Sequence, residues 1–76
     1  MQVTELAVGL TDGKGELVRL YDWRAQRKIT VREIDLKRKE GNSVKIVLYI
    51  AMPRHFDKAD FLRLQEDIPG VQSVEI

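Results

Sequence analysis

The closing segment Ile68-Pro69-Gly70-Val71-Gln72-Ser73-Val74-Glu75-Ile76 decides the fold of this chain. Pro69 and Gly70 stop a helix, because proline lacks an amide donor and glycine is favoured just past a helix end. After Gly70, apolar and polar residues alternate, which is the pattern of a half-buried strand. The chain is therefore expected to end with a helix, a tight turn and a last strand.

Upstream of this ending, the periodicity of apolar residues predicts three more strands and one more helix. The predicted strands cover residues 2–10, 29–39, 44–52 and 71–76, and the predicted helices cover residues 15–27 and 57–68. A change in the inward parity of the second strand suggests a bulge near Arg32. Asp57 is expected to cap the second helix.

Each predicted element has an expected buried side. On the strands these are Leu6, Val8 and Leu10, then Val44, Ile46, Leu48 and Ile50. On the helices they are Leu17, Val18, Leu20, Tyr21 and Ala25, then Phe61, Leu62, Leu64 and Ile68, with Trp23 beside the first stripe. These sides indicate one small core between a sheet and two helices.

The order strand, helix, strand, strand, helix, strand predicts an α+β fold of ferredoxin-like βαββαβ type. Right-handed crossovers then give a four-stranded antiparallel sheet in the order 4-1-3-2, with both helices on one face. The chain has 76 residues, enough for one small domain. It contains no cysteine, so neither disulfides nor thiolate metal sites support the fold.

Composition narrows the range of partners and locations. Thirteen basic residues nearly balance twelve acidic ones, so the domain as a whole lacks the electrostatic footprint of nucleic-acid binding. RNA-recognition modules share the topology but stack bases on aromatic residues of the central strands, where this chain has only Tyr49. No apolar run approaches the length of a membrane span, and a cytoplasmic location is expected.

The second strand is predicted to be a sheet edge, and it carries the basic residues Arg32, Lys37, Arg38 and Lys39. One interpretation is that these charges block edge-to-edge aggregation. The other is that they bind an anionic membrane surface, a nucleotide or a protein.

The uncovered face of the sheet is expected to carry an apolar stripe. By strand parity its residues are Val3, Ala7, Val47, Tyr49 and Ala51. Such a stripe on a domain with a small core favours an interface with a second copy or with other domains of a parent protein. Trp23, on the flank of the first helix, is more often a packing residue at such a position, but it is a further place to look for a partner.

The turn Asp12-Gly13-Lys14-Gly15 precedes the first helix and could hold an anion or an amino-acid carboxylate at the helix N-terminus. A plain turn is the alternative. Elsewhere, the single histidine, His55, has no second ligand nearby, and Asp57 and Asp60 are placed as caps. We therefore expect no catalytic residue, metal or cofactor.

The chain resembles ACT-like regulatory domains over nearly its full length. The resemblance lies in residues 12–15, in residues 29–34 entering the second strand, and in residues 61–74, which end on Ile68-Pro69-Gly70-Val71. Residues 48–53 and 57–62 are further similar to the cytosolic C-terminal domain of the MgtC/SapB family of membrane proteins. This resemblance implies an ACT-like domain over residues 1–76, excised from a membrane protein linked to magnesium homeostasis or transport.

One departure from the ACT pattern affects ligand binding. Lys14 stands where ligand-binding members of the group have a proline, so the resemblance suits a domain without a ligand. The sequence thus favours a non-enzymatic regulatory or assembly domain. An amino-acid sensor is the first alternative, and an RNA-binding module of the same topology is the second.

Overall fold

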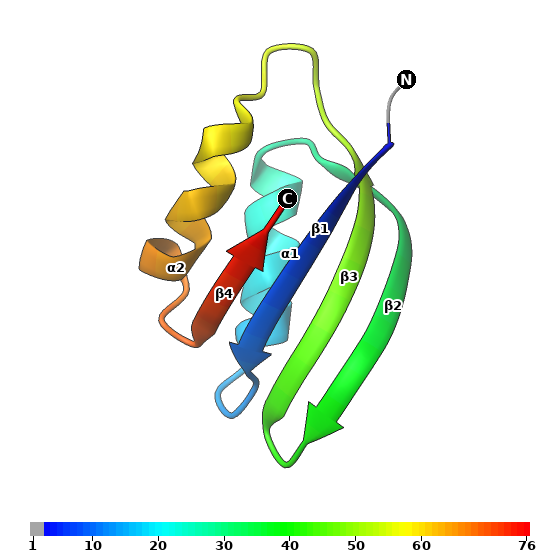
Figure 1. The fold of residues 1–76 in the computed structure, drawn as a ribbon. Coiled ribbons are helices and arrows are strands. Elements are labelled where there is room, and N and C mark those ends of the chain that lie inside the picture. Colours follow the sequence, from blue (N-terminus) through cyan, green and yellow to red (C-terminus); the bar gives the residue numbers. More distant parts are fainter. Residues whose placement is uncertain (1–2) are drawn as a thin grey trace.

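The computed structural model describes residues 3–76, which form one four-stranded sheet and two helical segments (Figure 1). In chain order the elements are β1 (Val3–Thr11), α1 (Glu16–Gln26), β2 (Thr30–Glu40), β3 (Ser43–Ala51), a 3₁₀ turn η1 (Lys58–Arg63) that continues into α2 (Leu64–Asp67), and β4 (Val71–Glu75). All strand pairs are antiparallel. The strand order is β2-β3-β1-β4, which is 4-1-3-2 read from the other edge, and the predicted α+β class is confirmed.

The two central strands, β1 and β3, supply the floor of the core. Their alternate residues Leu6, Val8 and Leu10 on β1, and Val44, Ile46, Leu48 and Ile50 on β3, are all buried. The pairing of β1 with β3 sets these residues side by side, with Leu6 opposite Leu48 and Val8 opposite Ile46. The period-two pattern read from the sequence is confirmed, because each strand has one face against the core and one against solvent.

The buried side of α1 differs from the predicted stripe. Leu20 and Trp23 point into the core, whereas Val18 is 64% exposed and Ala25 is also exposed. The helix turns its largest side chain inward, because burying an indole removes more apolar area from water than burying a valine. The prediction that Trp23 lies beside the buried stripe of this helix was therefore wrong. Its ring packs against Phe61, with the two ring centroids 5.8 Å apart.

The second helical segment begins where expected but is not one continuous α-helix. The Asp57 side chain accepts a hydrogen bond of 3.0 Å from the Ala59 amide, which confirms the cap. Phe61 and Leu64 are buried as predicted, but Leu62 is 61% exposed, because a 3₁₀ turn advances each residue by a larger angle than an α-helix does. One core cluster contains residues from β1, α1 and this segment, so both helices pack on the same face.

Strand β2 is an edge of the sheet and lies away from the helices (Figure 1). Its pairing with β3 skips between Val31 and Glu33, which confirms the predicted bulge at Arg32, and it skips again between Leu36 and Arg38. Most of the strand is exposed. The strand at the opposite edge, β4, is shorter, and it lies next to α2 (Figure 1).

Candidate functional site

In the loop that precedes α1, two carboxylates accept hydrogen bonds from backbone amides of the protein itself. The Asp12 Oδ1 atom accepts a hydrogen bond of 3.1 Å from the Leu17 amide, and Glu16 Oε1 accepts one of 2.7 Å from the Lys14 amide. Gly15 takes the left-handed backbone conformation, with φ of 81°, which glycine adopts without steric cost. Amides at a helix N-terminus are the groups that would hold a bound anion. Two of those around this loop already have an acceptor within the protein.

Glu16 is the residue of this loop that the sequence analysis missed. Its side chain is only 5% exposed, and it is the one buried charged residue among residues 3–76. A Cβ atom at Gly70 would collide with Glu16 Cγ and would lie 2.8 Å from the Thr11 carbonyl oxygen. The Thr11 amide also donates to the Gly70 carbonyl at 2.8 Å. Glu16 therefore fills the space between the loop and the Pro69-Gly70 turn. In the sequence, the features that could have predicted this contact are a glutamate directly after the loop and a glycine directly before β4.

A hollow of about 440 Å³ lies next to the loop. It is lined by Thr11, Gly13, Lys14, Glu16, Arg19, Pro69 and Gly70. The structure thus brings Gly13 and Lys14, two of the four predicted ligand residues, to one hollow beside the cation of Arg19. The Glu16 carboxylate at the same place opposes the binding of a second carboxylate.

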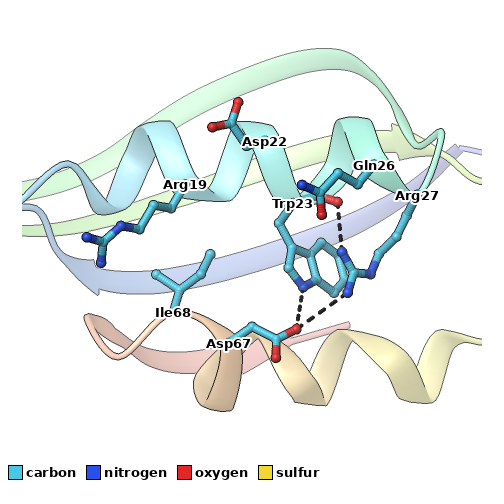
Figure 2. Close-up of a pocket in the computed structure, with 7 residues that line it drawn as sticks. All are labelled: Arg19, Asp22, Trp23, Gln26, Arg27, Asp67 and Ile68. Atoms are coloured by element: carbon cyan, nitrogen blue, oxygen red, sulfur yellow. Dashed lines mark hydrogen bonds and ion pairs between the residues drawn. The ribbon is translucent and has the colours of Figure 1, made fainter.

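A second hollow, of about 410 Å³, lies between α1 and α2 (Figure 2). At one end of it, Trp23 Nε1 donates a hydrogen bond of 2.8 Å to Asp67 Oδ2. The Arg27 guanidinium lies 3.9 Å from the centre of the Trp23 ring and 3.5 Å from the same carboxylate oxygen. Arg27 also donates to the Trp23 carbonyl oxygen at 3.1 Å. These groups satisfy one another, so they join the two helices, and Trp23 belongs to the core and not to the exposed surface where a partner was expected.

The open face of the sheet is less apolar than the sequence suggests. Val47 and Tyr49 are half-buried, as is Ala7, which lies opposite Val47. Val3 is exposed, but Ala51 is buried and cannot contribute contact area. The apolar part of this face is therefore a narrow stripe along β1 and β3.

Four acidic residues lie beside that stripe on the same face, and the strand register also places the cations of Lys45 and Arg38 on this face, beyond Val47. Glu5 lies opposite Tyr49, and Glu33 flanks Tyr49 from β2. Asp35 lies beside Val47, and Glu75 of β4 lies beside Ala7. Register decides this arrangement, since partners across an antiparallel pair share a face.

The pKa of Tyr49 reports the same cluster of negative charge. A hydrogen bond between the Tyr49 hydroxyl and Glu5 raises the pKa above its ordinary value of 10.0, and loss of hydration adds to the rise. The negative charges of Glu5, Asp35 and Glu33 raise it further. Each cause favours the neutral phenol over the phenolate.

The basic residues of β2 are all exposed, and Lys37 lies 3.7 Å from Asp35 on the same strand. His55 is exposed in the loop after β3. Within residues 3–76 there is no group of three or more His, Cys, Asp or Glu side chains placed to hold a metal ion. In the same range, no helix has the length and apolar character that crossing a membrane would require.

Comparisons of the chain with protein-family models, with curated proteins and with solved structures give no match. The resemblance to ACT-like domains and to the MgtC/SapB family therefore stays a prediction.

Proposed function

We propose that this chain is a non-enzymatic regulatory and assembly domain of ACT-like, ferredoxin-like type, and that it is the cytosolic part of a larger membrane protein of the MgtC/SapB kind. In that role it would influence magnesium homeostasis or transport by bringing subunits or domains of the parent protein together. The element order and the single helix-covered face support the fold assignment.

The observation that carries this proposal is the contrast between the two helix-side hollows and the sheet. In the hollows, the loop carboxylates and the Trp23–Asp67–Arg27 contacts satisfy polar groups from within the protein. On the sheet, a full face and an edge strand of 11 residues remain open to a partner. Apolar stripes with polar rims are typical of protein interfaces.

On the open face, the partner would be a surface with an apolar centre and basic groups on the side that meets Tyr49, because Glu5, Glu33 and Asp35 flank the stripe there. The substitution Val47→Asp is expected to weaken association at this face, since the interface would have to bury a further carboxylate. Val18→Asp is the matched control, because Val18 is an exposed valine on a different surface.

Sedimentation velocity of the wild type and both variants, up to about 1 mM protein, tests the proposal. The expected result is association of the wild type, less association of Val47→Asp, and no change for Val18→Asp. A wild type that remains a compact monomer at every concentration would contradict self-assembly of the domain. Equal association of all three proteins would remove the open face as the place of contact.

An amino-acid sensor is the second candidate, and the hollow that holds Lys14 and Arg19 beside α1 is the observation in its favour. Calorimetric titration with the twenty amino acids separates the two candidates. The assembly proposal expects no heat of binding from any of them. Binding that is lost in Lys14→Ala would favour the sensor.

A further inference from the structure

The two helices leave one margin of the sheet uncovered on their own side. Ile34 of β2 points to that side, because its partner Leu48 is buried in the core, and Leu36 follows two residues later. Leu36 is nevertheless 59% exposed and Ile34 is 39% exposed. The reason is that α1 lies over β1 and α2 next to β4, while β2 lies away from both helices (Figure 1).

Helix α1 has a second apolar side, and it faces this margin. Leu17 lines a third hollow, of about 240 Å³, together with Leu36 and Val44, so Leu17 lies on the β2 side of the helix. Tyr21 comes one turn later on the same side, and both residues are half-buried. The sequence analysis assigned both to the buried stripe of α1, but the core covers them only in part. We call the space between these residues and Ile34 and Leu36 the β2 groove.

The charged residues at the two ends of the β2 groove are mainly cations. Lys39 lines the hollow at one end, and Arg24 lies at the other, with its guanidinium 5.9 Å from the centre of the Tyr21 ring. Among residues 3–76, neither cation has an ion pair with a carboxylate. In the same range, the buried Nε of Arg24 has no hydrogen-bond acceptor. The carboxylate of Asp12 also lines the hollow, but it accepts a hydrogen bond from the backbone of α1.

We propose that the β2 groove binds an amphipathic helix of a partner protein, with an apolar stripe and acidic flanks. Leucine-sized side chains on that stripe would cover Ile34 and Leu36, and the carboxylates beside them would meet Lys39 and Arg24. This surface is not the open face, so the inference goes beyond the assembly function proposed above.

The shape of the free space indicates a helix. The uncovered place lies in the helix layer, beside α1, and the stretch of β2 from Ile34 to Lys39 extends about 16 Å at about 3.3 Å per residue. About three turns of helix have the same length. An extended segment would instead pair with the outer edge of β2, whose backbone groups point away from the groove. A helix is therefore the element that completes this layer.

Three labelled peptides of about 18 residues test the inference, since much shorter helices are marginal in water. The first has leucines at helical spacings of three and four, flanked by glutamates. The second has the same leucines flanked by lysines, and the third has the residues of the first in an order that breaks the spacing. Fluorescence anisotropy with up to about 1 mM protein measures binding. The first peptide is expected to have a Kd at least about tenfold lower than the other two.

Variants of the protein locate the contact. Leu36→Asp and Lys39→Glu are each expected to raise the Kd of the acidic peptide at least about tenfold, because each sets a carboxylate against the acidic flank of the peptide. Leu62→Asp and Lys45→Glu are the matched controls, and no change is expected from them. Leu62 is an exposed leucine of η1, and Lys45 is an exposed lysine of the open face. All four side chains are exposed, and circular dichroism checks that the variants fold.

The inference is overturned if the acidic peptide does not bind, if the basic peptide binds as tightly, or if Leu36→Asp and Leu62→Asp bind the acidic peptide equally well. Sedimentation with phosphatidylserine vesicles that is lost in Leu36→Asp would assign the groove to a lipid surface and would also overturn it. Loss of self-association in Leu36→Asp would assign the groove to a second copy. Sedimentation velocity of the chain alone tests the open face and the peptide titration tests the groove, so failure of one proposal is distinguishable from failure of the other.

Discussion

The helix-covered part of the sheet and the β2 margin are built from similar residues but are used in opposite ways. Val8 and Leu10 under the helices, and Leu64 of α2 above them, have no exposed area, whereas Leu36 of β2 remains mostly exposed. The helices lie over the β1 and β4 side, and β2 is held in the sheet by β3 alone (Figure 1). The core therefore lies toward one side of the sheet, and the exposed apolar residues in the middle of β2, Ile34 and Leu36, add little to it.

The largest expected effect tests the covered part. Leu64→Ala is expected to reduce the free energy of unfolding by about 2–5 kcal/mol, because a fully buried side chain is lost and leaves a cavity. Leu62→Ala is the matched control two residues away, and its 61% exposed side chain predicts a change within about 0.5 kcal/mol.

Urea unfolding followed by circular dichroism measures both changes. Since a domain of this size has a stability of only about 5–15 kcal/mol, Leu64→Ala is expected to remove a large share of it. Equal costs for the two leucines would mean that the segment from Lys58 to Asp67 does not pack as described.

A smaller effect is expected at the contact between the α1 loop and β4. Gly70→Ala is expected to cost about 1–3 kcal/mol, because the new methyl group would meet the Glu16 side chain and the Thr11 carbonyl oxygen. Gly13→Ala is the control in the same region, where the nearest atom, Asn42 Nδ2, would lie at an ordinary 3.6 Å.

Thermal unfolding of the two glycine variants provides the measurement. A Gly70→Ala protein as stable as the wild type would show that Glu16 does not fill this space. In that case the α1 N-terminus would be more open to a ligand than the structure indicates.

The sequence was sufficient to place the buried faces of β1 and β3, and the reason is physical. On β1 and β3, alternation has a single solution, because a shift by one residue would turn every buried side chain to solvent. The bulge at Arg32 was predicted for the same reason, since the inward parity changes there. The Pro69-Gly70 stop was predicted from the backbone limits of those two residues.

The helices were harder to predict, because their apolar residues allow more than one buried side. On α1, Val18 and Ala25 compete with Trp23 for the buried side, and the packing of Trp23 against Phe56 and Phe61 decides between them. On the second segment, the 3₁₀ geometry turned Leu62 outward.

For the candidate sites, the sequence predicts which segments are involved but not which distant residues they contact. The loop at residues 12–15 was identified, but nothing local to it shows that Glu16 is enclosed by Gly70, which is distant in sequence. Likewise, the basic residues of β2 were recognised as an edge cluster, whereas the acidic rim around Tyr49 depends on the register of three strands.

A modest effect is expected at the junction of α1 and α2. Trp23→Phe keeps an aromatic ring in the core but removes the hydrogen bond to Asp67, and it is expected to cost about 1–2 kcal/mol. The same loss should make a second substitution, Asp67→Asn, less costly than it is in the wild type. A double-mutant cycle by urea unfolding measures this coupling, and strictly additive costs would show that the two side chains do not interact.

The smallest effect concerns the acidic rim of the open face. The pKa of Tyr49 is raised above 10.0 by Glu5, and Glu5→Gln is therefore expected to lower it toward that value. The chain has two tyrosines, so a Tyr21→Phe background leaves one phenol to follow by its absorbance during a pH titration.

Because the raised pKa of Tyr49 belongs to the folded state, the associated stabilisation is present below pH 10.0 and is lost as the pH rises through the folded-state pKa. Glu66→Gln, an exposed glutamate outside this rim, is the control. A Tyr49 pKa that does not respond to Glu5→Gln would contradict the β1–β3 register on this face, and with it the carboxylate cluster around Tyr49.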